Sequence, residues 1–93
     1  MSIDVANNLT DQQFQAELSG HLAIIRYRYD DGVLVLTHTE VPDELGGQGV
    51  GSQLVRAALD FAKTEDLKIV PECPFIKAYI DKHDEYQSLL ASQ

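Results

Sequence analysis

The fold is decided by the stretch Leu36-Thr37-His38-Thr39-Glu40-Val41-Pro42, Asp43-Glu44-Leu45, Gly46-Gly47-Gln48-Gly49-Val50-Gly51-Ser52. A β-branched, strand-like segment ends at the proline, crosses a short acidic turn and enters a glycine-rich loop. The loop leads directly into an amphipathic helix, expected over 52–63. Because the first N–H groups of a helix lack intrahelical partners and carry partial positive charge, this junction is suited to a phosphate or pyrophosphate. Glycines also allow a ligand to approach the backbone closely.

Length and composition indicate one domain over residues 1–93, with residues 1–11 as a ragged N-terminus. Apolar residues make up 44% of the chain, an ordinary proportion for a folded protein. No apolar run is long enough to span a bilayer, and the N-terminus lacks the basic and apolar parts of a signal peptide. The single cysteine, Cys73, excludes an internal disulfide framework and fits a reducing compartment. We therefore expect a cytoplasmic protein without a membrane partner.

The charge of the chain argues against several kinds of partner. The net charge is −8, and the only lysines and arginines are Arg26, Arg28, Arg56, Lys63, Lys68, Lys77 and Lys82. Because nucleic-acid binding needs a basic patch, we expect no nucleic-acid partner. We also expect no metal, since His21, His38, His83 and Cys73 lack close ligand spacing. The acidity serves solubility or favours a cationic substrate or partner.

Three segments before the glycine loop are predicted to be strands. Residues 13–18 alternate between polar and apolar, which is typical of a half-buried strand. Residues 21–29 form a longer strand, and residues 33–41 form a third that is apolar on both faces at its start and therefore central. The turn signals Ser19-Gly20 and Asp31-Gly32 join the three into an antiparallel meander. Residues 1–11 are interpreted as a tail or a ragged first strand.

The glycine loop is followed by the clearest helical pattern in the chain. Its apolar stripe comprises Val50, Leu54, Ala57, Ala58, Phe61 and Ala62, and its outward face Gln53, Arg56, Asp60 and Lys63. Residues 67–70 form a short strand that, after a helix, is expected to run parallel to 33–41. Pro74 begins a second helix with the apolar face Phe75, Ile76, Tyr79, Ile80 and His83, and 84–90 form a further helical turn. The predicted fold class is α+β.

Two common phosphate-binding loops do not fit the glycine loop. A P-loop needs a lysine after its last glycine, but Ser52 follows Gly51. The dinucleotide fingerprint would begin at Gly49 and Gly51, and it then meets Leu54 where a glycine is needed. It also requires a parallel sheet, which a meander is not.

The glycine loop instead resembles motif A of the GCN5-related N-acetyltransferases, whose loop reads Arg/Gln-x-x-Gly-x-Gly/Ala. Together with His38-Thr39-Glu40-Val41-Pro42 and Val70-Pro71-Glu72-Cys73-Pro74-Phe75, it resembles the minimal, single-domain members of that family over about residues 14–90. The resemblance implies the minimal family fold, an antiparallel meander followed by a crossover helix, a parallel strand and a C-terminal helix. Gly46 stands where the motif has Arg or Gln, and only Ser19-Gly20 stands where family enzymes carry helices that help to form the acceptor site.

The resemblance implies that the protein binds acetyl-CoA as a cosubstrate. The pantetheine arm is expected to pair with the strand backbone at Thr39 and Val41. The thioester is expected in the splay between that strand and the parallel one, near Glu40 and Cys73. The pyrophosphate is expected against the backbone of Gly46, Gly47, Gln48, Gly49, Val50, Gly51 and Ser52.

Transfer to an amine requires a base, because only a neutral amine attacks. Glu40, at the end of the central strand, is the favoured candidate, and His38 on the same face is the second. Alternatively, Glu40 is a solvated carboxylate at the strand end and His38 is a packed, hydrogen-bonded strand histidine. A backbone N–H near Val41 could stabilise the developing oxyanion. Cys73 precedes a helix N-terminus, which permits a covalent acetyl-enzyme route, although direct transfer is usual in the family and buried cysteines are mostly inert.

Other side chains have weaker claims to a role. By resemblance, Tyr79 could protonate the leaving thiolate, or it is a core or rim aromatic. Lys77, Lys82 and Arg56 are candidates for the 3′-phosphate of the cofactor, or they are solvated.

Two functional hypotheses follow. The first is an N-acetyltransferase acting by general-base-assisted attack on a small-molecule or protein amine. The second is a non-catalytic acyl-CoA-binding or protein-interaction module on the same fold. A monomer and a homodimer both remain open, because an exposed sheet edge can pair with a second copy.

Overall fold

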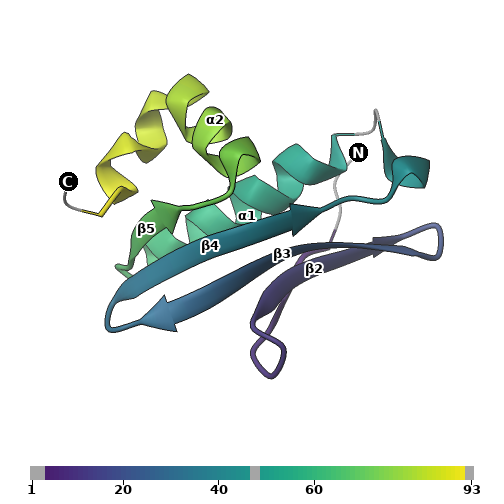
Figure 1. Cartoon of the computed structure of the whole chain (residues 1–93), viewed down its shortest axis with the longest axis horizontal. Coiled ribbons are helices and arrows are strands. Elements are labelled where there is room, and N and C mark those ends of the chain that lie inside the picture. The colour runs from purple at the N-terminus through teal and green to yellow at the C-terminus, as the bar shows by residue number, and fades with distance from the viewer. Residues whose placement is uncertain (1–3, 47–48, 92–93) are drawn as a thin grey trace.

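The computed structural model describes residues 4–46 and 49–91, which form a mixed five-stranded sheet with helices on one side (Figure 1). The strands lie in sequence order, and all neighbours are antiparallel except the last pair, which is parallel. The strands are β1 (Ala6–Asn8), β2 (Gln13–Leu18), β3 (His21–Asp30), β4 (Val33–Glu40) and β5 (Lys68–Pro71). The helices are η1 (Asp43–Leu45), α1 (Val50–Thr64), α2 (Pro74–Lys82) and η2 (Asp84–Leu89). The predicted α+β architecture is confirmed.

Both predicted hairpin turns are present. Asp31 and Gly32 have φ values of 46° and 83°, and Ser19 and Gly20 have φ values of 55° and 79°. Two successive positive φ values are the signature of the two-residue turn whose twist matches that of antiparallel strands. The strand predicted to be central, β4, is an interior strand between β3 and β5, although the middle strand of the five is β3.

The N-terminal region corrects one detail of the predicted meander. Ala6–Asn8 pair with 13–15 as a short first strand, so the expected first strand is the second. The connection between the first two strands is therefore Leu9–Gln12 and not Ser19-Gly20. Alternation of apolar residues could not reveal β1, because its sequence Ala-Asn-Asn has no apolar periodicity.

A β-bulge in β4 lies directly after the residue at which its pairing with β5 ends. Arg26 pairs with His38 but Tyr27 pairs with Leu36, which leaves Thr37 without a partner in the ladder. The Thr37 hydroxyl donates a hydrogen bond to the Arg26 carbonyl over 3.2 Å. Bulges bend a strand and increase its twist, so β4 changes direction just where its pairing with β5 ends.

Helix α1 packs across the sheet and provides much of the core. It begins at Val50, two residues before the predicted start, and its buried face is wider than the predicted stripe because Val55 and Leu59 are also fully buried. The reason is that α1 packs against the strands on one side and against α2 and η2 on another. Asp60, expected to face solvent, accepts a hydrogen bond from the Tyr86 hydroxyl over 2.8 Å.

The C-terminal segment covers the β5 edge of the sheet. Helix α2 and η2 follow β5 as predicted, with Pro74 at the first helical position. The Ala91 N–H donates to the Ile69 carbonyl over 2.9 Å, and Leu90 bridges to Ile69. Covering an edge in this way removes unpaired backbone groups that could pair with another chain. Over residues 4–46 and 49–91, no helix is long and apolar enough to cross a membrane.

We predict that Leu54→Ala lowers the free energy of unfolding by about 2–5 kcal/mol, because Leu54 is fully buried between α1 and the sheet and the change leaves a cavity. Urea denaturation measures the loss. Leu22→Ala is the matched control, since Leu22 is 46% exposed and its truncation should cost less than about 1 kcal/mol. Equal losses in the two variants would contradict this description of the core.

Candidate active site

The start of α1 has the geometry of an anion-binding helix terminus. Gly49 precedes the helix with φ 72° and ψ 15°, a left-handed conformation that favours glycine. No side chain caps the helix, and among the described residues no acceptor faces the N–H groups of Val50, Gly51 and Ser52. The first turn also contains no acidic residue. These N–H groups are therefore available to an anion. The predicted contacts Gly47 and Gln48 lie outside the described residues.

A hollow of about 250 Å³, here called the loop hollow, lies directly beside this helix start. Its lining contains seven residues of the predicted binding segment or its flanks, together with one residue of α2: Val41, Leu45, Gly46, Gly49, Val50, Gly51, Ser52 and Phe75. A Cβ atom added to Gly51 would come within 3.1 Å of the Phe75 ring, so glycine is what allows the ring and the helix to approach each other here.

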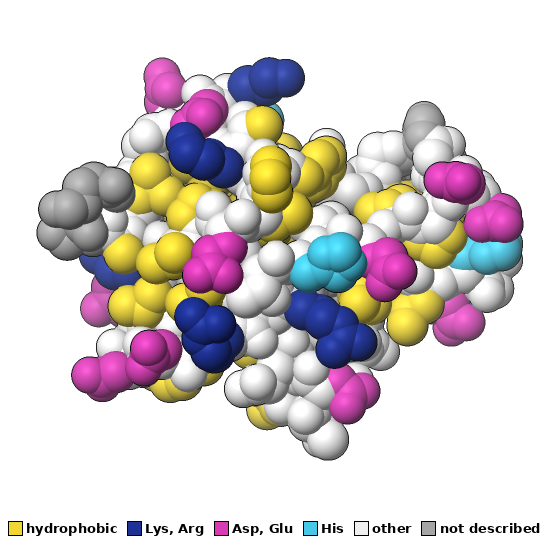
Figure 2. Space-filling view, in the orientation of Figure 1, with side chains coloured by type: hydrophobic (Ala, Val, Ile, Leu, Met, Phe, Trp, Pro, Cys, Tyr) yellow, Lys and Arg dark blue, Asp and Glu magenta, His cyan; other side chains and the backbone are white. Residues whose placement is uncertain are grey.

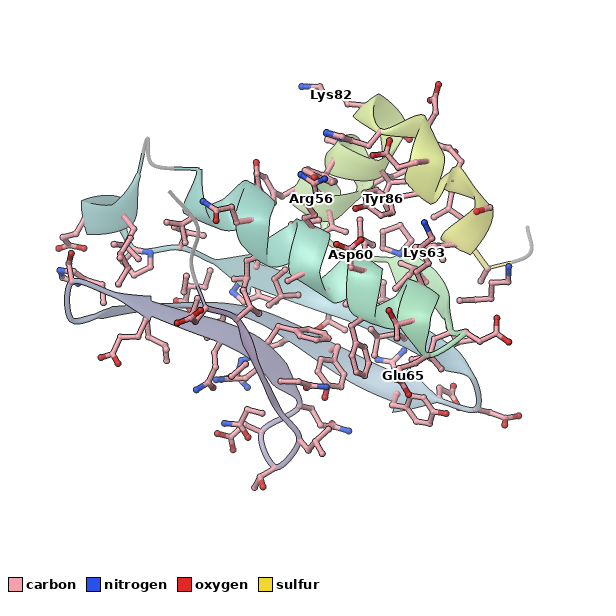
Figure 3. The ribbon with its side chains drawn as sticks, turned by 180° about the vertical axis from the view of Figure 1, so that it is seen from behind. Arg56, Asp60, Lys63, Glu65, Lys82 and Tyr86 are labelled. Atoms are coloured by element: carbon pink, nitrogen blue, oxygen red, sulfur yellow. The ribbon has the colours of Figure 1, made fainter. Side chains whose placement is uncertain are left out.

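A second hollow of about 360 Å³, here called the helix hollow, shares Ser52 and Phe75 with the first. It runs between α1 and α2 and is otherwise lined by Ala78, Tyr79, Lys82 and His83. Arg56 lies one turn after Ser52 and extends from α1 toward α2, on the side of Lys82 (Figure 3). The two hollows are neighbours with Ser52 and Phe75 as their shared wall; we call them together the groove, and cations lie at its outer end.

The third candidate cation lies elsewhere. Lys77 forms an ion pair with Asp81 over 3.6 Å, and both line a separate hollow with Pro71 and Gln87. Of the three cations that the sequence suggests for a phosphate, the structure therefore brings Arg56 and Lys82 to the groove and leaves Lys77 outside it.

Val41, which lines the loop hollow, directly follows β4, the strand that diverges from β5. Pairing between the two strands ends at Leu36 and Pro71, and Pro71 has no N–H with which to continue the ladder. The Leu36 carbonyl then accepts hydrogen bonds from the N–H groups of Glu72 and Cys73, over 3.0 and 3.2 Å. The chain turns into α2 there, while β4 continues to Glu40. The predicted splay between these strands is present.

Cys73 and Thr39 face each other across this splay. The Cys73 thiol donates a hydrogen bond to the Thr39 hydroxyl oxygen, with Sγ and Oγ1 3.3 Å apart. Burial by itself raises the pKa of the Cys73 thiol, but the Thr39 side chain and the backbone N–H groups of Ile76 and Phe75 outweigh it, so the pKa is lowered overall. These N–H groups belong to the first turn of α2, where partial positive charge favours a thiolate.

His38 and Glu40 project from the opposite face of the sheet. Thr39 pairs with Ile25, a core residue on the helix side, so its two neighbours alternate to the other face. Both are exposed, as is Arg26, which pairs with His38. Figure 2 looks onto this open face, where histidine, basic and acidic side chains gather near the centre. The structure therefore places the two base candidates on one side of β4 and the thiol on the other.

Two tyrosines lie between α1 and the C-terminal segment. The Tyr79 ring stacks on His83 with centroids 3.9 Å apart, and burial raises its pKa, with a smaller opposing effect of Arg56. Burial and the hydrogen bond to Asp60 raise the pKa of Tyr86 to about 12. Tyr79 lines the helix hollow and not the loop hollow, so it forms a wall of the outer groove.

The sequence did not identify Phe75 as part of the site. It was assigned to the apolar face of the second helix, but it is 46% exposed and separates the two hollows. Its position directly after the helix-starting Pro74 was the available signal, since the first turn of that helix faces the glycine loop. In the described part of the chain, no group of three metal-ligating side chains is close enough to hold a metal ion.

Known proteins share this combination of a splayed mixed sheet and a glycine-rich helix start, which defines an N-acetyltransferase-like domain. Residues 13–89 match the family model of the GCN5-related N-acetyltransferases. The chain therefore belongs to the GCN5-related N-acetyltransferase family.

Individual relatives agree with this assignment. The chain is 38% identical to Protein NATD1 of Xenopus tropicalis over 85 residues, which cover 88% of this chain and 78% of that protein. It is also 38% identical to Protein NATD1 of Homo sapiens over 84 residues, covering 87% of this chain and 74% of that protein. A GCN5-like candidate N-acetyltransferase from Staphylococcus aureus, solved by NMR, matches with a TM-score of 0.74 and 34% identity, covering 97% of this chain and 89% of that one.

We predict that Thr39→Val raises the pKa of the Cys73 thiol. In the ionised state the Thr39 hydroxyl can rotate and donate to the sulfur, and valine removes that donor while keeping the shape of the side chain. The pH profile of alkylation by iodoacetamide, which follows the thiolate, should move to higher pH. Thr37→Val is the control, because its hydroxyl bonds the Arg26 carbonyl. A profile that moves equally in both variants, or in neither, would contradict the role of Thr39.

Proposed function

We propose that this protein binds acetyl-CoA in the groove between the glycine loop, α1 and α2, and transfers the acetyl group to an amine. The observation that carries the proposal is the groove beside the start of α1, which has Lys82 in its lining at one end and, at the other, Val41, two residues after Thr39 of the splay. A long, thin ligand with a phosphate-rich end and a reactive end matches this sequence of environments. Membership in the family supports the choice of acetyl-CoA.

The residues of the groove fit such a ligand. Gly49 adopts a conformation that an L side chain rarely takes, and a Cβ at Gly51 would meet the Phe75 ring at 3.1 Å. The backbone of the loop hollow therefore stays uncovered for the pyrophosphate, where Val50, Gly51 and Ser52 would donate their N–H groups. Arg56 and Lys82 would neutralise the 3′-phosphate at the outer end. Thr39 and Val41 would pair with the pantetheine amides at the end of β4.

The chemistry of transfer is divided between the two faces of β4. Acetyl-CoA supplies an activated thioester, and the splay would hold that end beside Cys73. The amine would approach from the open face, where Glu40 takes the proton that the attacking nitrogen must lose and His38 is the second base. The backbone N–H of Val41 would stabilise negative charge on the acyl oxygen. We assign direct transfer: the bond between nitrogen and the acetyl carbon forms, the C–S bond of the thioester breaks, and the CoA thiolate leaves and takes a proton from solvent, while Cys73 forms no acetyl-enzyme.

The open face of the sheet leaves room for amines of different sizes. The connection Leu9–Gln12 is too short to supply helices over this face, so an amine on a small molecule or on a protein can reach β4. The same short connection is the observation that favours the alternative function, a non-catalytic acyl-CoA-binding or interaction module. We propose a cytoplasmic location on the basis of the reduced cysteine and the cytosolic supply of acetyl-CoA that such a reaction requires.

We predict that Glu40→Gln lowers the rate of acetyl transfer from acetyl-CoA to amines about 100-fold and leaves the dissociation constant of acetyl-CoA unchanged, because it removes the base and no cofactor contact. Release of CoA in the presence of a panel of polyamines, lysine peptides and N-terminal peptides measures the rate. The loss should shrink at high pH, where more of the amine is already neutral.

Glu17→Gln is the matched control, since Glu17 is another exposed carboxylate on the open face, paired with Leu22 near the same end of the sheet. It should retain the full rate. Equal losses in the two variants would show that the negative charge of the face matters and not a base at Glu40. An acetyl group on Cys73 during turnover, detected by mass spectrometry, would contradict direct transfer. Binding of acetyl-CoA without transfer to any amine would favour the non-catalytic alternative.

A further inference from the structure

An aromatic hollow of about 370 Å³ lies at the other end of the sheet, under the C-terminal end of α1, and the proposed function does not use it. We call it the distal hollow. Three of its walls are the rings of Tyr27, Tyr29 and Phe61, and Glu65 stands beside them. Its volume is within the range of small-ligand pockets. The β3–β4 hairpin next to it and the glycine loop are at opposite ends of β4 (Figure 1).

Two of the three rings of the distal hollow, Tyr27 and Phe61, are held in place before any ligand binds. The Tyr27 hydroxyl donates a hydrogen bond to Asn7 Oδ1 over 2.6 Å. Phe14 packs behind two of the rings, with centroid distances of 5.1 Å to Tyr27 and 5.5 Å to Phe61. The Tyr27 N–H also donates to the carbonyl of Gln12, which fixes the β1–β2 turn against β3. A ligand here would meet two preformed aromatic side chains, so of the three rings only Tyr29 would have to be ordered on binding.

The distal hollow also concentrates apolar surface that the fold leaves uncovered. Leu9 is 74% exposed and Tyr29 is 54% exposed, and both line it. Burial of large apolar side chains is favourable, so two such side chains left beside one concave site indicate a surface that a ligand can cover.

The charges around the distal hollow determine whether it favours an anionic or a cationic ligand. Glu65 ends α1, where the carbonyl end of the helix adds partial negative charge, and Asp66 follows it. The Lys68 N–H donates to the Gly32 carbonyl, which brings the hairpin carboxylate Asp31 to the same end of the molecule. The nearby cations are directed elsewhere. Lys68 Nζ donates to the Ser88 carbonyl over 3.0 Å, and Lys63 leaves α1 on a different side from Glu65 (Figure 3).

We propose that the distal hollow binds a small quaternary ammonium ion. Aromatic faces attract such a cation through their quadrupole, and Glu65 adds a carboxylate at the rim. The alternatives fit less well. An anion would meet Glu65 and the helix C-terminus, and a neutral apolar ligand would gain no attraction from Glu65. The site is independent of the acetyl-CoA groove, so its test can succeed or fail whatever the outcome for acetyl transfer.

The test compares choline with its neutral isostere 3,3-dimethylbutan-1-ol, by titration of the ¹⁵N-labelled protein and observation of amide chemical shifts. We expect choline to bind at least about tenfold more tightly than the alcohol and to perturb the amides of Leu9, Gln12, Tyr29 and Leu67. Glu65→Gln and Tyr29→Ala should each weaken choline binding about fivefold. Both side chains are exposed, so both variants should fold.

Glu17→Gln changes the net charge equally at the far end of β2 and should leave choline binding unchanged. Three results would overturn the proposal. One is equal affinity for choline and the alcohol. Another is an equal loss of affinity in Glu17→Gln and Glu65→Gln, which would show general attraction to an acidic protein. The third is perturbation of amides away from the distal hollow.

Discussion

The active-site end of the molecule depends on the carbonyl group of Leu36. This single oxygen accepts the N–H groups of both Glu72 and Cys73, immediately after Pro71 ends the parallel ladder. The chain therefore leaves the sheet and enters α2 at Pro74, while β4 continues past its bulge at Thr37. Without this early separation, no gap would exist between the strands, and the Cys73 thiol would not face Thr39.

The groove must attract an anionic ligand although the chain has a net charge of −8. An acidic protein repels an anionic ligand at long range, so attraction must come from short-range, fixed dipoles. The uncapped first turn of α1 contains no acidic residue and provides such dipoles, and Arg56 and Lys82 supply point charges at the outer end. The distal hollow, at the opposite end of the molecule, favours positive charge instead. It lies at the negative end of the same helix and beside the carboxylate of Glu65. The dipole of helix α1 thus favours an anion at one end of the molecule and a cation at the other.

The sequence predicted the fold well because its signals were local. The two Gly-containing turns, the 3.6-residue periodicity of α1 and the prolines around Cys73 each determine structure within a few residues. The short strand Ala6–Asn8 was predicted only as one of two alternatives, a tail or a ragged first strand, because its pairing with β2 depends on tertiary contact and not on apolar alternation. Val55 and Leu59 were placed outside the buried stripe for a similar reason. A single amphipathic face cannot show that a helix is covered from two directions.

The site was predictable in its backbone and less so in its side chains. Glycine spacing located the helix start, and the order of strand, loop and helix located the splay near Cys73. Strand alternation alone does not predict which face of the sheet His38, Thr39 and Glu40 share with Leu36. The bulge at Thr37 shifts the register by one residue, so the alternation before it does not continue after it. The exposure of Phe75 and the separation of Lys77 from the groove depend on how α2 sits against α1, which no local pattern encodes.

The most direct test of the acyl-CoA groove is calorimetric titration of acetyl-CoA into the wild-type protein, Gly49→Ala and Gly32→Ala. Both glycines have positive φ, so both substitutions introduce similar backbone strain, but only Gly49 lines the groove. We expect micromolar binding to the wild type and to Gly32→Ala, with affinity about tenfold lower in Gly49→Ala. No binding to the wild type at millimolar acetyl-CoA, or equal affinity in the two variants, would contradict the account.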